Sequence, residues 1–158
     1  MTSEIGPLHG NVPLLFTTTF AILSVNEEET SVSYIQHKSE ESIEDYLETI
    51  LILSKRLPAV RSIDIAAALS YSKPSVSVAM KNLRYRNLIL VNEDGGILLT
   101  EEGRRIAEST YERHTLLTDW LISLGVSPQI AAADACKMEH DMTPESFDAI
   151  KRFILCHQ

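Results

Sequence analysis

The chain has 158 residues, of which 44% are hydrophobic and 23% charged, as in one globular domain or a small pair of domains. This composition excludes a disordered chain, and the two cysteines do not form the repeating pattern of a disulfide framework. Free thiols are typical of a cytoplasmic protein. The longest apolar run, residues 12–25, is too short to span a bilayer and follows no basic segment, so we expect neither a membrane span nor a signal peptide.

The net charge of −8 is unevenly distributed along the chain. Residues 55–86 hold seven lysines and arginines against one acidic residue, Asp64, whereas the segments on both sides are acidic. A basic segment inside an acidic chain indicates a local site for a polyanion such as nucleic acid. A solvated helical face is the alternative that charge alone leaves open.

Residues 1–38 show neither a clear helical period nor strand alternation, and we treat them as an N-terminal extension. Within them, residues 14–25 are compatible with a short strand or hairpin, and Glu27–Glu29 with a solvated tail. From Ser39 the helical signals are strong. Ser39 or Ser42 can cap a helix that has glutamates in its first turns and a broad apolar face.

A second helix is predicted over residues 62–69. A third is capped by Ser72, with Pro74 in its first turn, where a missing N–H costs nothing. The apolar positions expected to face the core of these two helices are Ile63, Ala66, Ala67, Leu69, Val76, Met80 and Leu83. After them, two apolar runs, residues 88–91 and 97–99, flank a Gly-Gly turn and indicate a β-hairpin.

Three further helices are predicted in the second half of the chain. Thr100 caps a long fourth helix over about residues 101–124, which ends at Gly125. The dipeptides Ser127-Pro128 and Thr143-Pro144 begin a fifth and a sixth helix, because each places a capping side chain before a proline.

The order helix, helix, turn, helix, hairpin is that of a winged helix-turn-helix, whose third helix enters the major groove of DNA. We therefore predict a mainly α chain, with a winged helix-turn-helix DNA-binding domain over residues 39–100 and a helical domain over residues 101–158. Polar residues of the third helix suit contacts to phosphates and base edges. Those expected to bind DNA are Ser72, Lys73, Pro74, Ser75, Ser77, Lys81 and Arg84. A small helical bundle with an incidental hairpin is the alternative.

The predicted fifth helix carries a cluster of metal-ligand types. Cys136, Glu139 and His140 stand at i, i+3 and i+4, so that a thiol, a carboxylate and an imidazole share one helix face. All three are ligands of first-row transition metals. Alone, Cys136 would be a small buried hydrophobe and Glu139 a surface acid. The x-x-Glu-His spacing also occurs in di-iron helical bundles.

Further ligand types lie on two other predicted helices. Asp45 and Glu48 are one turn apart and would repel each other unless solvated, sharing a proton or bridged by a cation. Asp45 can instead close a capping box with Ser42, and Glu48 can simply be exposed. His114 lies on the apolar stripe of the fourth helix, where a lone histidine is more often a packed core residue. The convergence of three helices favours one metal site, or two closely spaced ones, built from Asp45, Glu48, His114, Cys136, Glu139 and His140.

Over about residues 40–155 the chain resembles the DtxR/MntR family of metal-dependent transcriptional repressors. The motifs that carry the resemblance are Glu44-Asp45-Tyr46-Leu47-Glu48, Ser72-Lys73-Pro74-Ser75-Val76-Ser77, Leu99-Thr100-Glu101-Glu102-Gly103, Arg113-His114 and Asp134-Ala135-Cys136-Lys137-Met138-Glu139-His140. The resemblance implies that the same six residues ligate the metal. The manganese branch shares Asp45 and Glu48 but has Glu in place of Cys136. The iron branch shares Cys136 but has Met in place of Asp45.

The resemblance implies a cytoplasmic homodimeric repressor that senses Mn(II) or Fe(II), binds double-stranded operator DNA and controls metal-homeostasis genes. The dimer core would come from Trp120, Leu121, Leu124, Ile130 and the last helix. One rival is a metal-independent winged-helix regulator with an organic effector. The other is a di-metal hydrolase or oxidase, which we do not favour because no nucleophile or additional base accompanies the ligands.

Overall fold

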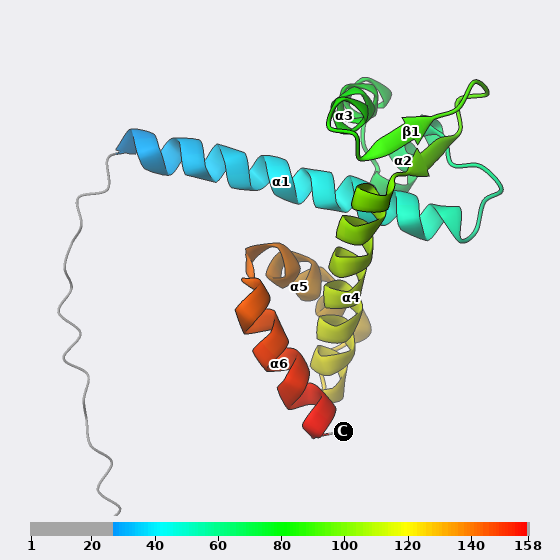
Figure 1. Ribbon diagram of the computed structural model, residues 1–158. Helices are drawn as coiled ribbons and strands as arrows, with labels where there is room; N and C mark the ends of the chain where they lie inside the picture. Colours follow the sequence, from blue (N-terminus) through cyan, green and yellow to red (C-terminus); the bar gives the residue numbers. More distant parts are fainter. Residues whose placement is uncertain (1–26, 158) are drawn as a thin grey trace, which may run out of the picture.

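The computed structural model describes residues 27–157, with side chains from Glu40 onward. This part of the chain forms six helices and one two-stranded antiparallel sheet (Figure 1). In chain order the elements are α1 (Glu27–Ser54), α2 (Ser62–Leu69), α3 (Lys73–Tyr85), β1 (Ile89–Val91), β2 (Ile97–Leu99), α4 (Glu101–Ser123), α5 (Pro128–Asp141) and α6 (Pro144–Cys156). The predicted mainly α fold and the winged order of elements are confirmed.

Two further predictions concern a membrane span and a possible strand near the N-terminus. None of the helices between residues 27 and 157 is long and apolar enough to cross a membrane. The apolar run at residues 12–25, with its possible strand or hairpin, lies outside the described residues.

The first helix begins at Glu27, well before its predicted start at Ser39. Its 28 residues contain neither glycine nor proline, so nothing in the sequence breaks the helix before Ser39. The run of three glutamates, predicted to be a solvated tail, opens the helix, where carboxylates suit the positive end of the helix dipole. Ser42 and Asp45 are therefore interior residues. The interpretation of Ser39 or Ser42 as the helix cap is therefore wrong, and so is the capping box of Asp45 with Ser42.

Later helices begin where the sequence predicts, because side chains cap their first turns. The caps of α3, α4 and α6 each accept a hydrogen bond from the backbone N–H three residues on. The pairs are Ser75 to Ser72 Oγ at 3.2 Å, Gly103 to Thr100 Oγ1 at 3.1 Å and Ser146 to Thr143 Oγ1 at 3.3 Å. The predicted hairpin is also present, with Ile89 of β1 opposite Leu99 of β2.

Helix α2 turns a partly different face to the core from the one predicted, although Ala66 and Leu69 lie in or against the core as expected. It buries Ile65 and Ala66, whereas Ile63 is 56% exposed and Ala67 is also exposed. Eight residues are too few for an apolar pattern to define one face, especially when most of them are apolar. In α3, by contrast, the predicted residues Val76, Met80 and Leu83 are buried.

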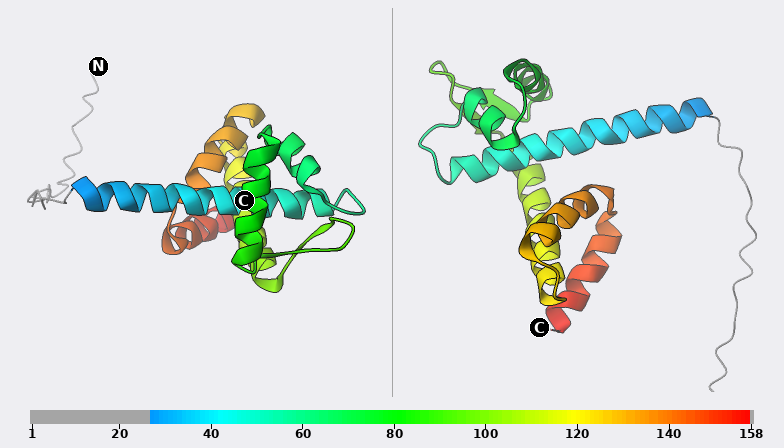
Figure 2. Two further views of the ribbon diagram at one scale, coloured as in Figure 1. Left: turned by 90° about the horizontal axis from the view of Figure 1, so that it is seen from above. Right: turned by 180° about the vertical axis from the view of Figure 1, so that it is seen from behind.

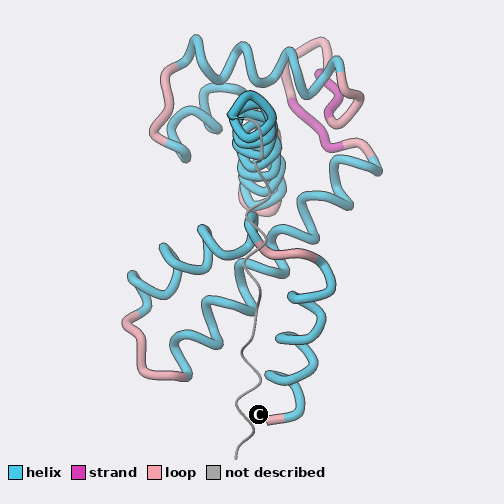
Figure 3. Tube along the Cα trace, turned by 90° about the vertical axis from the view of Figure 1, so that its left-hand side faces the viewer, coloured by secondary structure: helices cyan, strands magenta, loops and turns pink. Residues whose placement is uncertain are grey.

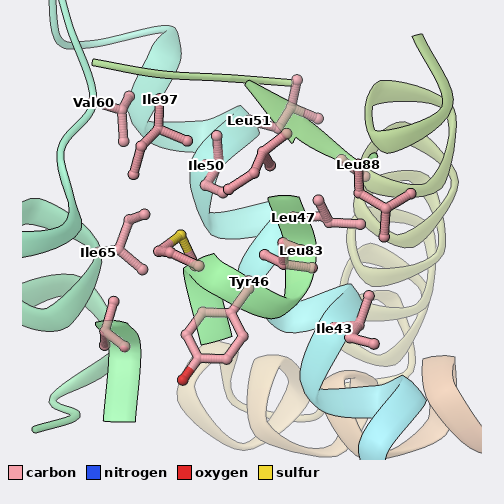
Figure 4. Close-up of a cluster of buried hydrophobic side chains, with 14 of the residues drawn as sticks. Ile43, Tyr46, Leu47, Ile50, Leu51, Val60, Ile65, Leu83, Leu88 and Ile97 are labelled. Atoms are coloured by element: carbon pink, nitrogen blue, oxygen red, sulfur yellow. The ribbon is translucent and has the colours of Figure 1, made fainter. Parts of the chain in front are cut away.

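One hydrophobic core joins α1 to the winged elements (Figure 4). Leu47, Ile50 and Leu51 of α1 are almost fully buried among side chains of α2, α3 and the hairpin. Ala107 of α4 belongs to the same core. The C-terminal half of α1 is therefore an integral part of the winged helix-turn-helix.

The second half of the chain is a layer of helices on the other side of α1. Helix α4 starts at the hairpin, crosses α1 and packs along α5 and α6 (Figures 1 and 2). Figure 3, which looks along α1, shows the winged elements on one side of this helix and α5 and α6 on the other. Helix α1 thus lies between the two halves, with the winged core on one face and α5 near the opposite face.

A close backbone contact ties the start of α4 to the hairpin, and it supplies a first prediction. A methyl group on Gly103 would lie 2.0 Å from the backbone oxygen of Leu88, which also accepts the N–H of Thr100. Overpacking against backbone costs about 1–3 kcal/mol or more, which exceeds the gain of about 1 kcal/mol in helix propensity. We expect Gly103→Ala to lower the free energy of unfolding by about 2 kcal/mol in urea denaturation followed by circular dichroism.

Ser109→Ala, at an exposed position of the same helix, is the control and should change this free energy by less than about 0.5 kcal/mol. Equal stability of Gly103→Ala and the wild type would contradict the packing argument.

Candidate metal centre

The six predicted ligands come together where α1, α4 and α5 meet. Asp45, Cys136 and His140 each offer one ligand atom, and these atoms lie within 4.8 Å of one another. The Nε2 atom of His140 is 3.1 Å from Asp45 Oδ1 and 3.4 Å from Glu139 Oε1. The other three predicted residues adjoin this group, and we call all six the ligand cluster: Asp45, Glu48, His114, Cys136, Glu139 and His140.

His114 and Glu139 form the second half of the ligand cluster. The Nδ1 atom of His114 lies 2.9 Å from Glu139 Oε2, and the Glu139 side chain has no solvent exposure. Glu48 is close enough for its charge to act on both residues. The alternative interpretations made Glu139 a surface acid and Glu48 a simply exposed residue. Both are wrong, because each side chain has a buried carboxylate oxygen.

Two carboxylate oxygens in the ligand cluster are buried without a hydrogen bond. They are Glu48 Oε1 and Glu139 Oε1, and neither has a hydrogen bond among the described residues. Burial, followed by the charge of Glu139, raises the pKa of Glu48 to about 7. Unpaired buried carboxylate oxygens are costly, so the cluster is destabilising unless protons or a cation neutralise it.

Histidine and cysteine in the ligand cluster respond to the same carboxylates. Burial lowers the pKa of His140, but hydrogen bonds to Asp45 and Glu44 outweigh burial and raise it to about 10. The hydrogen bond to Glu139 raises the pKa of His114 against the effect of burial. Partial desolvation and then the neighbouring carboxylates raise the pKa of the Cys136 thiol to about 11.

The donor set fits a divalent transition metal. It offers carboxylate oxygen, imidazole nitrogen and one thiol, and two of its buried carboxylate oxygens lack hydrogen bonds. A divalent cation would neutralise these groups, and its binding would require His140 and Cys136 to give up protons. When bound, such a metal would supply fixed positive charge and directed bonds between α1 and the two helices of the other half.

Two side chains behind the ligand cluster appeared in the sequence motifs but were assigned no role at the site. Glu44 approaches His140 Nδ1 at 2.7 Å, although its sequence position suggested only a favourable charge near a helix start. Arg113 donates to the backbone oxygens of Glu139 at 3.1 Å and Met142 at 3.4 Å, so it caps the end of α5. The Arg113-His114 motif was the signal available for Arg113.

The predicted DNA-contacting residues all lie on the exposed side of α3. The Ser72 and Ser75 hydroxyl oxygens are 2.7 Å apart, so these two side chains already contact each other at the helix start. Sequence analysis missed Val78, which is 67% exposed on the same helix. An apolar residue at this position is suited to contact with a thymine methyl group.

Fold and site together define a class: a winged helix-turn-helix protein with a metal-ligand cluster at the junction of its two halves. The family model for the N-terminal DNA-binding domain of iron-dependent repressors matches residues 38–97. The model for the metal-binding and dimerisation domain of the same repressors matches residues 100–155. The chain belongs to the iron-dependent repressor family, which is a family of metal-dependent transcriptional regulators.

Named relatives agree with this assignment. The transcriptional regulator MntR of Escherichia coli O157:H7 is 38% identical over 136 residues, which cover 84% of this chain and 88% of that protein. The HTH-type transcriptional regulator MntR of Geobacillus kaustophilus (strain HTA426) is 34% identical over 109 residues, covering 69% and 77% of the two chains.

Solved structures of regulators share the fold. The manganese regulator SloR superposes with a TM-score of 0.65 at 31% identity, and the metal-dependent transcriptional regulator MtsR with 0.67 at 26% identity. Each match covers 71% of this chain and 53% of the other. The chain therefore spans about half the length of these two structures.

Proposed function

We propose that this protein is a cytoplasmic, homodimeric repressor that binds Mn(II), or alternatively Fe(II), at the ligand cluster and then binds operator DNA upstream of metal-homeostasis genes. In this proposal residues 39–100 bind DNA, and residues 101–158 hold the metal with α1 and dimerise. The relatives named MntR and the manganese regulator SloR support manganese, and so do the carboxylates of the cluster.

One observation carries the proposal: the ligands come from both halves of the molecule. Asp45 and Glu48 stand on α1, which forms part of the winged core, whereas the other four ligands stand on α4 and α5. Binding a cation between them would hold the DNA-binding half against the helical half. The metal then acts as an allosteric ligand, and by reciprocity DNA binding tightens metal binding.

The DNA-binding surface in this proposal is the exposed side of α3. Lys73, Lys81 and Arg84 would contact phosphates or guanine edges, and Ser77 a phosphate or base edge. Ser72, Pro74 and Ser75 would position the start of α3 against the backbone. Two such helices in a homodimer would meet successive major-groove half-sites.

Exposed apolar residues on α5, α6 and the loop after α4 support a homodimer. Leu124 is 63% exposed, Ile130 56%, Phe153 57% and Leu155 61%. Exposed apolar side chains of this kind on a regulator of a dimerising family are suited to an interface between two copies. Trp120 and Leu121, which are partly buried, would line its inner edge.

Metal removal tests the proposal directly. We expect chelator-treated protein to bind operator DNA at least tenfold more weakly than protein saturated with Mn(II), in gel shift and fluorescence anisotropy at constant salt. Titrations with Fe(II), Co(II) and Zn(II) rank the metals by how strongly each promotes operator binding. Equally tight operator binding by the chelated protein would refute the proposal and favour the metal-independent regulator with an organic effector.

Cys136 is one of the two ligand positions at which the manganese and iron branches differ, the other being Asp45. Replacing its thiol with a hard carboxylate should favour Mn(II) over softer ions. We expect Cys136→Glu to raise the Mn(II) affinity relative to Zn(II) and Co(II) by about tenfold, measured by competitive metal titration. Cys156→Glu, at an exposed position of α6, is the control. An unchanged ranking of metals in Cys136→Glu would contradict a role of the thiol in selectivity.

A further inference from the structure

The imidazole of His140 is held on both sides by carboxylates. Its Nδ1 atom lies 2.7 Å from Glu44 Oε2, and its Nε2 atom lies 3.1 Å from Asp45 Oδ1. The His140 side chain is only 2% exposed, so these contacts replace water around the ring. The two nitrogens are therefore distinguishable: one faces Glu44, and the other faces the ligand cluster.

We propose that Glu44 is a positioning residue that accepts the Nδ1–H of His140 and thereby presents the Nε2 lone pair to the metal. This inference rests on the proposed function. Metal-binding histidines usually donate their second ring N–H to a carboxylate or carbonyl, which selects the tautomer and holds the ring in place. Glu44 and His140 meet this description across the α1–α5 contact.

The surroundings of each nitrogen support Nε2 as the ligand atom. Nε2 lies near two predicted ligands, Asp45 at 3.1 Å and Glu139 at 3.4 Å. The two nitrogens of an imidazole point away from each other, so the Glu44 carboxylate lies on the side of the ring away from Asp45. A cation beside Asp45 and Cys136 would meet Nε2 and leave the Nδ1–H of His140 with Glu44.

Glu44 also lies beside two arginines of α4. Its side chain is 33% exposed and lines a polar cavity of about 180 Å³ between α1 and α4, together with Arg105, Ser109 and Arg113. A carboxylate accepts a shorter and stronger hydrogen bond than a neutral group does. Replacing the Glu44 carboxylate with an amide should therefore weaken its hydrogen bond to His140.

The test measures metal binding in matched variants of the full chain. We expect Glu44→Ala to weaken Mn(II) binding by about 10-fold to 100-fold in calorimetry. Glu44→Gln keeps the shape and an acceptor oxygen, so it should lose about half as much on a logarithmic scale. Glu41→Gln is the control, because Glu41 lies one turn away on α1 and acts on Cys136 through its charge. It should stay within about twofold of the wild type.

A second measurement reports the tautomer of His140 directly. In the Zn(II)-loaded wild type, nitrogen-15 NMR of the imidazoles should show His140 protonated at Nδ1 and metal-bound at Nε2, and Glu44→Ala should lose the slow exchange of the Nδ1 proton. Metal bound at Nδ1 would overturn the inference. So would equal losses of affinity in Glu44→Ala and Glu41→Gln, which would indicate a general charge effect.

The two hypotheses fail in different ways. If wild-type protein binds Mn(II) but Glu44→Ala binds it equally well, only the positioning role is lost. If the wild type itself binds operator DNA without any metal, the proposed function is lost.

Discussion

We expect His140→Ala to reduce Mn(II) affinity by more than 100-fold and to abolish the stimulation of operator binding by metal. His140 contacts three carboxylates from two helices, so its loss removes the central donor of the ligand cluster and leaves those carboxylates uncompensated. Loss of a residue that merely orients a ligand costs about 10-fold to 100-fold, and loss of a ligand should exceed this. Calorimetry and operator gel shifts across a Mn(II) titration give the two values.

His157→Ala is the matched control for this variant. His157 is exposed at the end of α6, where its ring stacks on Phe153, so its loss should leave metal and operator binding unchanged. The thermal unfolding midpoints of both metal-free variants establish that they are folded. Operator binding by His140→Ala that still rises with Mn(II) as in the wild type would exclude His140 as a ligand.

Glu48→Gln should have opposite effects on stability and on metal binding. Burial and the charge of Glu139 raise the pKa of Glu48 to about 7 in the folded, metal-free protein, above its usual value of 4.5. A raised carboxyl pKa means that folding favours the proton, so this contribution to stability is lost as pH rises through 7. We expect metal-free Glu48→Gln to be more stable than the wild type at pH 8 by about 1–2 kcal/mol, after allowance for solvent screening.

The same substitution should weaken Mn(II) binding by at least tenfold, because an amide is a poorer ligand than a carboxylate. Urea denaturation of chelated protein at pH 5 and pH 8 measures the stability, and the advantage of the variant should be small at pH 5. Glu93→Gln in the exposed turn of the hairpin is the control for a change of net charge. A variant less stable than the wild type at pH 8 would show that Glu48 is not under electrostatic strain.

Helix starts were predictable where a local chemical signal exists. Ser72, Thr100 and Thr143 cap α3, α4 and α6 because a hydroxyl three residues before a backbone N–H satisfies that donor within a single turn. The start of α1 had equally good candidate caps at Ser39 and Ser42, but a capping residue only permits a helix start. In α1 no glycine or proline precedes these two serines, and the helix continues through them.

The ligand types were also readable, because helical spacing places Cys136, Glu139 and His140 on one face. It was harder to predict which face of a short helix is buried and which residues contact the ligands from behind. The face of α2 depends on what packs against it, and the alternation of only eight residues does not define that. Glu44 adjoins Asp45 in the sequence, yet its role arises from a contact with a residue 96 positions away.

Helices α1 and α4 cross each other. Each carries both a residue packed against the winged elements and a residue of the ligand cluster. On α1, Leu47 is fully buried in the winged core while the next residue, Glu48, turns by about 100° around the axis into the ligand cluster. On α4, Gly103 abuts the hairpin and His114 lies three turns further along. Within each of these helices, no loop separates the ligand residue from the core residue. On the proposed function, a bound cation would act on the angle at which α1 and α4 cross, and a small change of this angle would displace the far end of a rigid helix by more. The spacing between the two copies of α3 in a dimer would then be set by the crossing angle of α1 and α4.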